Sequence, residues 1–228
     1  MSAEHEGYAI LNCQMNFPFC MIITGSSGAG KSVFANQFIM NFNRLVDTNL
    51  DYCCWFHGIE THEIKNSTTS DIRYVQGLPE DLSSYIIDEQ NGLFVFDDLQ
   101  YELLQSKQVA EFCQKTSHHR NVAMIIILQD AYAEGPYRKS LMRSTHFFVL
   151  FPNFLDNSVT YSLASKILPR DQRTFFDIYE HCTSLKNKNY GYLFISGQPK
   201  TPYQIRFRTD IFGPTQTCLI PRKWLVKK

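Results

Sequence analysis

One stretch of eight residues, Gly25–Ser32, constrains the fold of this chain more than any other feature. It reads Gly-Ser-Ser-Gly-Ala-Gly-Lys-Ser and matches the pattern G-x-x-x-x-G-K-[S/T]. The apolar run Phe19–Thr24 precedes it, and the stretch Lys31–Arg44, in which phenylalanine recurs every fourth residue, follows it. The sequence therefore predicts a buried strand, a glycine-rich turn and a helix, which is the order that a phosphate-binding loop requires.

The residue types of this loop suit the binding of a nucleoside triphosphate. Glycines let backbone amides surround the β-phosphate, and the first amides of the helix add donors and a favourable dipole. Lys31 is expected to reach the β- and γ-phosphates, and the Ser32 hydroxyl to ligate Mg²⁺. We therefore predict ATP and Mg²⁺ as cofactors. The predicted nucleotide-binding residues are Gly25, Ser26, Ser27, Gly28, Ala29, Gly30, Lys31, Ser32 and Val33.

Polar residues end two further apolar runs. Asp97 and Asp98 follow Leu93–Phe96, and Gln129 follows Ala123–Leu128. Asp97 is predicted to hold the magnesium shell, and Asp98 to orient or deprotonate the attacking water. Gln129 is predicted to contact the γ-phosphate or that water. The alternatives are a helix-capping role for Asp98 and an ordinary surface position for Gln129.

Arginines near the strand ends are candidates for a further catalytic role. Hydrolysis of ATP gains from a positive charge on the γ-phosphate, which another subunit often supplies. Arg120, Arg138 and Arg143 stand close to the runs that we expect to be strands. Each of them, taken singly, also suits an ordinary surface position.

Apolar runs without polar alternation alternate with helix-like stretches, which predicts an α/β fold with a mostly parallel sheet covered on both faces. With the loop and the paired acids, the predicted class is a P-loop NTPase of the ASCE (RecA-like) type. The expected strands are Phe19–Thr24, Tyr52–Phe56, Ile72–Val75, Leu93–Phe96, Ala123–Leu128 and Phe147–Phe151, followed by a C-terminal β-hairpin of Tyr190–Ser196 and Gln204–Arg208. The expected helices are Lys31–Arg44, Glu102–Ser117, Val159–Ile167 and Gln172–His181.

Composition narrows the class of protein. Twenty-two basic and 22 acidic residues give a formal charge of zero, which excludes a protein whose whole surface holds nucleic acid electrostatically. The aliphatic run Met124–Leu128 is far shorter than the roughly 20 residues of a membrane span, so none is expected. The N-terminus does not resemble a secretion signal, so the protein is not expected to be secreted. We predict an ATPase domain over residues 1–213 and a basic tail over 214–228.

The seven cysteines are expected to be reduced thiols in a protein that is not secreted. Cys53, Cys54, His57 and His62 have spacings that could bind zinc. A buried strand that contains the two cysteines, with the histidines on the following loop, is the preferred interpretation.

The ordered motifs resemble those of DNA-packaging ATPases. The resemblance is carried by Thr116–Asn121, Met124–Asp130 and Arg138–Pro152, and again by Tyr190–Leu193 and Arg206–Phe212. The chain is similar to the packaging ATPases of Polinton (Maverick) elements and adintoviruses, which are related to the poxvirus packaging ATPase. The resemblance covers residues 17–213, although the segment 130–136 is less typical of the family than its neighbours.

The resemblance implies a member of the FtsK–HerA superfamily, whose rings move double-stranded DNA through a central pore. It implies phosphate and magnesium binding by Lys31 and Ser32, and assigns sensing of the γ-phosphate to Gln129. Arg120 matches the arginine that lies before the sensor strand in that superfamily, which makes it the first choice for a finger that acts in trans, and Arg138 and Arg143 remain open. Asp97 and Asp98 match its magnesium-binding and water-activating acids.

The implied partners are double-stranded DNA, a viral capsid or portal vertex, and further copies of the chain in a ring of five or six. The implied location is inside the host cell, in the nucleus or at a viral assembly site, or with the virion. The residues predicted to contact DNA are left open among Lys65, Arg73, Lys186 and Lys188.

Two other functions remain open. A P-loop kinase of nucleosides or nucleotides would phosphorylate a small acceptor without stimulation by DNA. An ATP-switched interaction protein would hydrolyse ATP weakly, and the second carboxylate, Asp98, argues against it because a protein that only binds ATP needs no such group.

Overall fold

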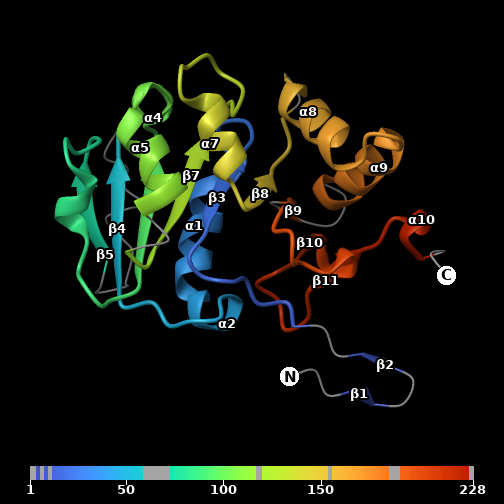
Figure 1. Cartoon of the computed structure of the whole chain (residues 1–228). Coiled ribbons are helices and arrows are strands. Elements are labelled where there is room, and N and C mark those ends of the chain that lie inside the picture. Colours follow the sequence, from blue (N-terminus) through green and yellow to red (C-terminus); the bar gives the residue numbers. More distant parts are fainter. Residues whose placement is uncertain are drawn as a thin grey trace.

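The computed structural model describes residues 4–5, 8–9, 12–58, 72–116, 120–153, 156–184 and 191–225. Its core is a nine-stranded sheet with the strand order β11-β10-β9-β8-β3-β7-β6-β4-β5 (Figure 1). In that order the strands are β11 (Thr217–Leu219), β10 (Phe207–Thr209), β9 (Leu193–Ser196), β8 (Phe147–Leu150), β3 (Cys20–Thr24), β7 (Val122–Leu128), β6 (Gly92–Asp97), β4 (Tyr52–His57) and β5 (Ile72–Gln76). Residues 4–5 and 8–9 form a separate two-stranded pair, β1 (Glu4–His5) and β2 (Tyr8–Ala9).

The six strands from β8 to β5 are parallel, and β9, β10 and β11 pair antiparallel. Every residue of β3, β4, β7 and β8 is buried, as expected for strands that are covered on both faces. β7 lies between β3 and β6, so the strand before the glycine-rich loop, the strand before Gln129 and the strand that ends at Asp97 are neighbours. The predicted α/β class, with a mostly parallel sheet and a C-terminal hairpin, is confirmed.

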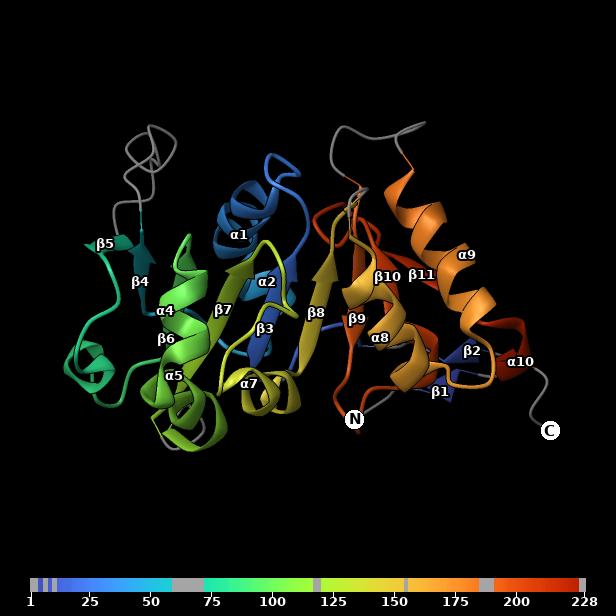
Figure 2. The same cartoon turned by 90° about the horizontal axis from the view of Figure 1, so that it is seen from above.

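Helices cover both faces of the sheet (Figure 2). On one face, α1 (Lys31–Met40) and α2 (Phe42–Leu45) contribute phenylalanines to an apolar cluster with β3, β4 and β6. The opposite face is covered by α4 (Gln100–Gln105), α5 (Lys107–Glu111), the π-helical turn η2 (Phe112–Thr116), α7 (Arg138–Ser144), α8 (Ser158–Ile167) and α9 (Gln172–Thr183). Short helices are η1 (Leu82–Tyr85), η3 (Tyr203–Ile205) and α10 (Arg222–Leu225).

Polar side chains break two of the predicted helices. The helix expected over 31–44 is interrupted at Asn41, whose side-chain amide donates to the carbonyl of Gln37 at 2.8 Å. The helix expected over 102–117 begins two residues earlier and is interrupted at Ser106. The Ser106 hydroxyl accepts from the amide of Val109 at 3.2 Å and so begins a new helix. Both breaks arise because side-chain groups compete for backbone hydrogen bonds.

The C-terminal residues extend the sheet beyond the predicted hairpin. β11, which was not predicted, pairs with β10 and places Thr217 opposite Thr209. Trp224 stacks on Phe207 with ring centroids 5.6 Å apart. The segment 214–225, which the sequence suggested as a basic tail, therefore packs against the same sheet as the predicted ATPase domain.

The buried guanidinium of Arg208 joins three segments near this end of the sheet. Its side chain is 1% exposed. It donates to the carbonyl of Cys13 at 2.6 Å and to Oε1 of Gln216 at 2.9 Å, and it lies 4.5 Å from the ring centroid of Phe194. Burial lowers the pKa of this guanidinium. Arg208 is therefore a structural cation that lies within the predicted ATPase domain.

Three further predictions concern residues outside the site. Cys53 and Cys54 lie in β4 and face opposite clusters, so they cannot bind one metal together, whereas His62 lies outside the described residues. Lys65, Lys186 and Lys188 also lie outside them, and the Arg73 guanidinium stacks 4.6 Å from the ring centroid of Tyr85. Within the described part of the chain, no helix is long and apolar enough to span a membrane.

Candidate functional site

The glycine-rich loop lies between β3 and α1 at the carboxyl edge of the parallel strands. Gly25 has φ 153°, and a Cβ atom there would lie 2.5 Å from Cβ of Phe151. Gly30 precedes α1 with φ 97°, a left-handed conformation. Side chains at these two positions would collide or strain the backbone, so glycine is needed for the loop to turn onto the start of the helix. The loop amides and the positive end of α1 together form an anion-binding feature.

Lys31 reaches back over the loop. Its ammonium donates to the carbonyl of Gly25 at 2.8 Å and to that of Ser26 at 2.7 Å, and the residue is 8% exposed. Burial lowers the pKa of Lys31, and the nearby carboxylates of Asp97 and Asp98 partly oppose this effect. The cation is therefore held inside the glycine-rich loop by two of its carbonyls.

Asp97, the last residue of β6, lies close to Ser32, in the first turn of α1. Burial raises the pKa of the Asp97 carboxyl, and hydrogen bonding by the nearby Ser32 side chain partly opposes the rise. A carboxylate and a hydroxyl side by side are hard oxygen ligands, which are the donors that Mg²⁺ prefers. The chemistry of these two residues fits a magnesium ion that binds together with the phosphates, and their role as its ligands stays a prediction.

Asp98 is exposed and has a left-handed backbone with φ 56°. The first residue after β4, Gly58, donates its amide to the carbonyl of Asp97 at 3.1 Å. A Cβ atom on Gly58 would lie 2.1 Å from the carbonyl oxygen of Asp98, so only glycine allows this close approach. The N-cap of α4 is Leu99, without a side-chain cap, so Asp98 does not take the predicted alternative role of a helix cap. Its exposed carboxylate is available to water.

Gln129 directly follows β7 and is exposed at the same edge. Its carbonyl accepts from the hydroxyl of Thr24, the last residue before the glycine-rich loop, at 3.5 Å. Oε1 of Gln100 accepts from the amides of Gln129 and Asp130 at 2.8 and 2.9 Å. Gln100 was not predicted as a site residue, since only its closeness to Asp98 in the sequence could have suggested it.

The candidate arginines lie in different places. Arg120 precedes β7, at the edge opposite Gln129, and the seven-residue strand separates the two by roughly 20 Å. Its guanidinium pairs with the carboxylate of Asp88 at 3.0 Å, and both side chains are exposed. The structure therefore does not bring Arg120 to the site of its own chain, and its role in trans stays a prediction. Arg143 lies in the last turn of α7.

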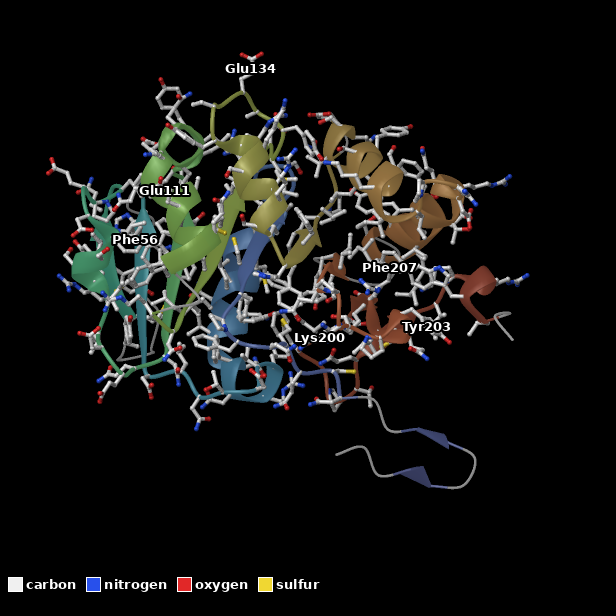
Figure 3. The ribbon with its side chains drawn as sticks, viewed as in Figure 1. Phe56, Glu111, Glu134, Lys200, Tyr203 and Phe207 are labelled. Carbon is white, nitrogen blue, oxygen red and sulfur yellow. The ribbon has the colours of Figure 1, made fainter. Side chains whose placement is uncertain are left out.

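Arg138 belongs to a cluster beside the loop that follows β7. Its guanidinium donates to the carbonyl of Tyr132 at 2.9 Å and lies 5.3 Å from the centroid of that ring. Lys166 of α8 donates to the Tyr132 hydroxyl at 3.1 Å. In Figure 3, Glu134 marks the tip of this loop, beyond the carboxyl ends of the strands. The cluster fastens the segment after Gln129 to α8.

The predicted site thus converges at one edge of the sheet. The structure brings together the glycine-rich loop, the two acids and Gln129, and leaves Arg120 at the opposite edge. Val33 lies in the first turn of α1 and is 37% exposed. The chemistry of these residues suits the binding of a triphosphate and a divalent cation, with the exposed carboxylate of Asp98 open to water.

The comparisons with known proteins bear on the fold. No protein-family model and no curated protein sequence matches the chain. The genome packaging NTPase B204 from Sulfolobus turreted icosahedral virus 2 is similar in structure. In complex with sulfate it aligns with TM-score 0.52 and 13% identity over 78% of this chain and 91% of that chain. In complex with AMPPCP it aligns with TM-score 0.52 and 14% identity over 80% of this chain and 94% of that chain. At these identities the likeness concerns the fold alone, and this chain has the fold of a P-loop NTPase.

Proposed function

We propose that this chain is an ATP-hydrolysing motor that moves double-stranded DNA into a viral capsid. The observation that carries the hydrolytic part is the exposed Asp98 carboxylate beside Asp97 and Ser32, at the edge that bears the glycine-rich loop. A protein that only binds ATP needs the loop and the metal ligands, whereas water attack on the γ-phosphate gains from a second acid.

The packaging part rests on two kinds of support. The ordered motifs resemble DNA-packaging ATPases, and the fold is shared with a solved viral genome packaging NTPase. We assign the chain to the FtsK–HerA superfamily on this basis, with the Polinton, adintovirus and poxvirus enzymes as its proposed kin. Its proposed partners are double-stranded DNA, further copies of the chain in a ring of five or six, and a capsid or portal vertex. The host nucleus or a viral assembly site is its proposed place of action.

In the proposed mechanism, the loop amides and Lys31 hold the phosphates and neutralise charge that develops on them. Ser32 and Asp97 are the residues that would hold Mg²⁺, which when bound would neutralise negative charge on the phosphates. Asp98 orients or deprotonates water, and Gln129 contacts the γ-phosphate or that water. An arginine of a neighbouring subunit, with Arg120 as the first choice, completes the charge balance in the ring.

The deciding experiment measures ATP hydrolysis with and without linear double-stranded DNA. The expected result is hydrolysis that DNA stimulates, and that the variant Asp98→Asn lacks although it still binds ATP. Glu102→Gln is the matched control, because it removes an exposed acid in the first turn of α4 that faces the same solvent. Transfer of phosphate to a small acceptor, without DNA stimulation, would instead identify a kinase. Full turnover by Asp98→Asn would show that Asp98 is not the base.

A further inference from the structure

A row of polar residues crosses three strands at the carboxyl edge. The strand pairing places His57 of β4 opposite Asp97 of β6 on one side and opposite Gln76 of β5 on the other. His57 therefore stands between the proposed magnesium-binding carboxylate and the outer strand of the sheet. It belongs to the group of cysteines and histidines that the sequence singled out, and the proposed function gives it no role.

The side chains of His57 and Asp97 leave the sheet on the same face. In β4, Trp55 packs in the cluster that includes α1, and in β6 the same is true of Val95. Side chains two residues apart in a strand share a face, so His57 and Asp97 both point toward the α1 side. Phe56, the residue before His57, packs in the cluster on the opposite face.

The imidazole of His57 is buried and incompletely paired. The residue is 6% exposed, and its Nδ1 atom has no hydrogen-bond partner among the described residues. An unpaired polar atom at such a depth is costly, and in a native structure it calls for an explanation. The neighbouring carboxylate, which is predicted to bind a hydrated metal ion, offers one.

Backbone hydrogen bonds fix the chain on both sides of His57. Gly77, which follows β5, donates its amide to the carbonyl of His57 at 2.8 Å. On the other side Gly58 donates to the carbonyl of Asp97 and packs against the peptide of Asp98. His57 thus lies on a segment that is fixed directly to the two acids, as second ligand shells of metal sites usually are.

We propose that His57 is a positioning residue of the magnesium site, which orients the Asp97 carboxylate and the metal-bound water beside it from the neighbouring strand. This inference rests on the proposed function, because it concerns the metal that the nucleotide brings. His57 acts through Asp97 and does not itself touch the phosphates.

The test compares nucleotide affinity in Mg²⁺ with that in EDTA, using a fluorescent ATP analogue and purified full-length chain. His57→Phe keeps an aromatic side chain but removes both ring nitrogens. In this variant the ratio of nucleotide affinity in Mg²⁺ to that in EDTA should fall about tenfold, which is typical of a lost outer-shell contact. The affinity in EDTA itself should not change. His57→Asn puts an amide nitrogen near the position of Nδ1 and should restore most of the magnesium effect.

Trp55→Phe is the matched control. The Nε1 atom of Trp55 is also buried and without a partner among the described residues, on the same strand and face but two residues further from the edge. Its removal should leave the ratio of the two affinities as in the wild type. An unchanged ratio in His57→Phe, or an equal loss in Trp55→Phe, would overturn the proposal.

Two further outcomes are informative. If His57→Phe does not fold, His57→Asn is compared with His57→Gln, whose amide stands farther from the backbone; equal ratios in these two variants would also overturn the proposal. If Mg²⁺ adds nothing to the affinity of the wild-type chain, the proposed function fails as well. If the wild-type chain responds to Mg²⁺ and hydrolyses ATP, and the His57 variants have the same affinity ratio as the wild type, only the role of His57 is refuted and the proposed function stands.

Discussion

The side-chain oxygen of Gln100 accepts the backbone amide of Gln129 at 2.8 Å. This bond joins the segment after the two acids to the segment that was predicted to sense the γ-phosphate. Gln100 also accepts from the amide of Asp130, so one side chain terminates β7. The position of Gln129 therefore depends on a residue that stands beside the acids in the sequence.

Removal of this acceptor should slow hydrolysis. Gln100→Leu cannot accept either amide, so Gln129 should lose its fixed position. Hydrolysis should then fall by up to roughly a hundredfold, which is what a misplacement of about 1 Å can cost. ATP affinity should stay close to that of the wild type, because the glycine-rich loop is untouched. Gln100→Glu keeps an acceptor and serves as the control; steady-state hydrolysis and nucleotide titration decide. Equal activity of the Leu and Glu variants would contradict the role of this bond.

A methyl group at Gly58 should disturb both acids. In Gly58→Ala the new Cβ would collide with the carbonyl of Asp98, so the segment must shift, and overpacking of this kind costs about 1–3 kcal/mol. Hydrolysis should fall with it, since Asp98 is displaced. Gly77→Ala is the control, because a Cβ there has nothing within 4 Å and meets only the strain of φ 78°. Urea unfolding and hydrolysis assays check the prediction. It would be contradicted if Gly58→Ala lost less stability and less hydrolytic activity than Gly77→Ala.

Asp97→Asn should stabilise the chain while it abolishes magnesium-dependent hydrolysis. Burial raises the pKa of Asp97, so the folded state disfavours its charged form. That penalty is fully present above the raised pKa and disappears as the pH falls toward 3.8, where the unfolded state is protonated too. The variant should therefore melt at a higher temperature than the wild type near pH 7.

The control for that measurement is pH itself. Thermal melts of the wild type and of Asp97→Asn should draw together as the buffer is taken from pH 7 toward pH 4. A stability gain that is constant over this range would mean that another contact, and not the buried charge, accounts for the difference.

Arg120 should act only between subunits. Arg120→Ala should bind ATP normally but lose hydrolysis in the proposed ring, by about 10³-fold if it supplies the arginine finger. Rings mixed from Arg120→Ala and Asp98→Asn subunits should regain activity, because some sites then combine an intact acid with a neighbour's intact arginine.

Two variants sharpen the Arg120 test. Asp88→Asn releases the Arg120 guanidinium from its ion pair and should leave hydrolysis unchanged, since exposed pairs contribute little. Arg143→Ala, in α7, should also leave it unchanged if Arg120 is the finger. Mixed rings without recovered activity, or loss of ATP binding in Arg120→Ala, would assign Arg120 a structural role.

The sequence predicted the convergence of the acids, the loop and Gln129 because parallel strands place their carboxyl ends at one edge. It could not predict Gln100 or Gly58, whose roles arise from contacts between segments that are distant along the chain. The helix breaks at Asn41 and Ser106 arise from single side-chain hydrogen bonds, which periodicity does not reveal. β11 was missed because its three residues, Thr-Cys-Leu, show too short a pattern to distinguish a strand from a loop.

The buried guanidinium of Arg208 has a consequence for how the chain opens. It ties the carbonyl of Cys13 to β10 and, through Gln216, to the turn before β11. The amide hydrogens of these two ends should therefore exchange with solvent as one cooperative unit, although about two hundred residues of chain separate them. Cleavage of the backbone in the turn before β11 would then also loosen the segment around Cys13. The two segments therefore share one local stability.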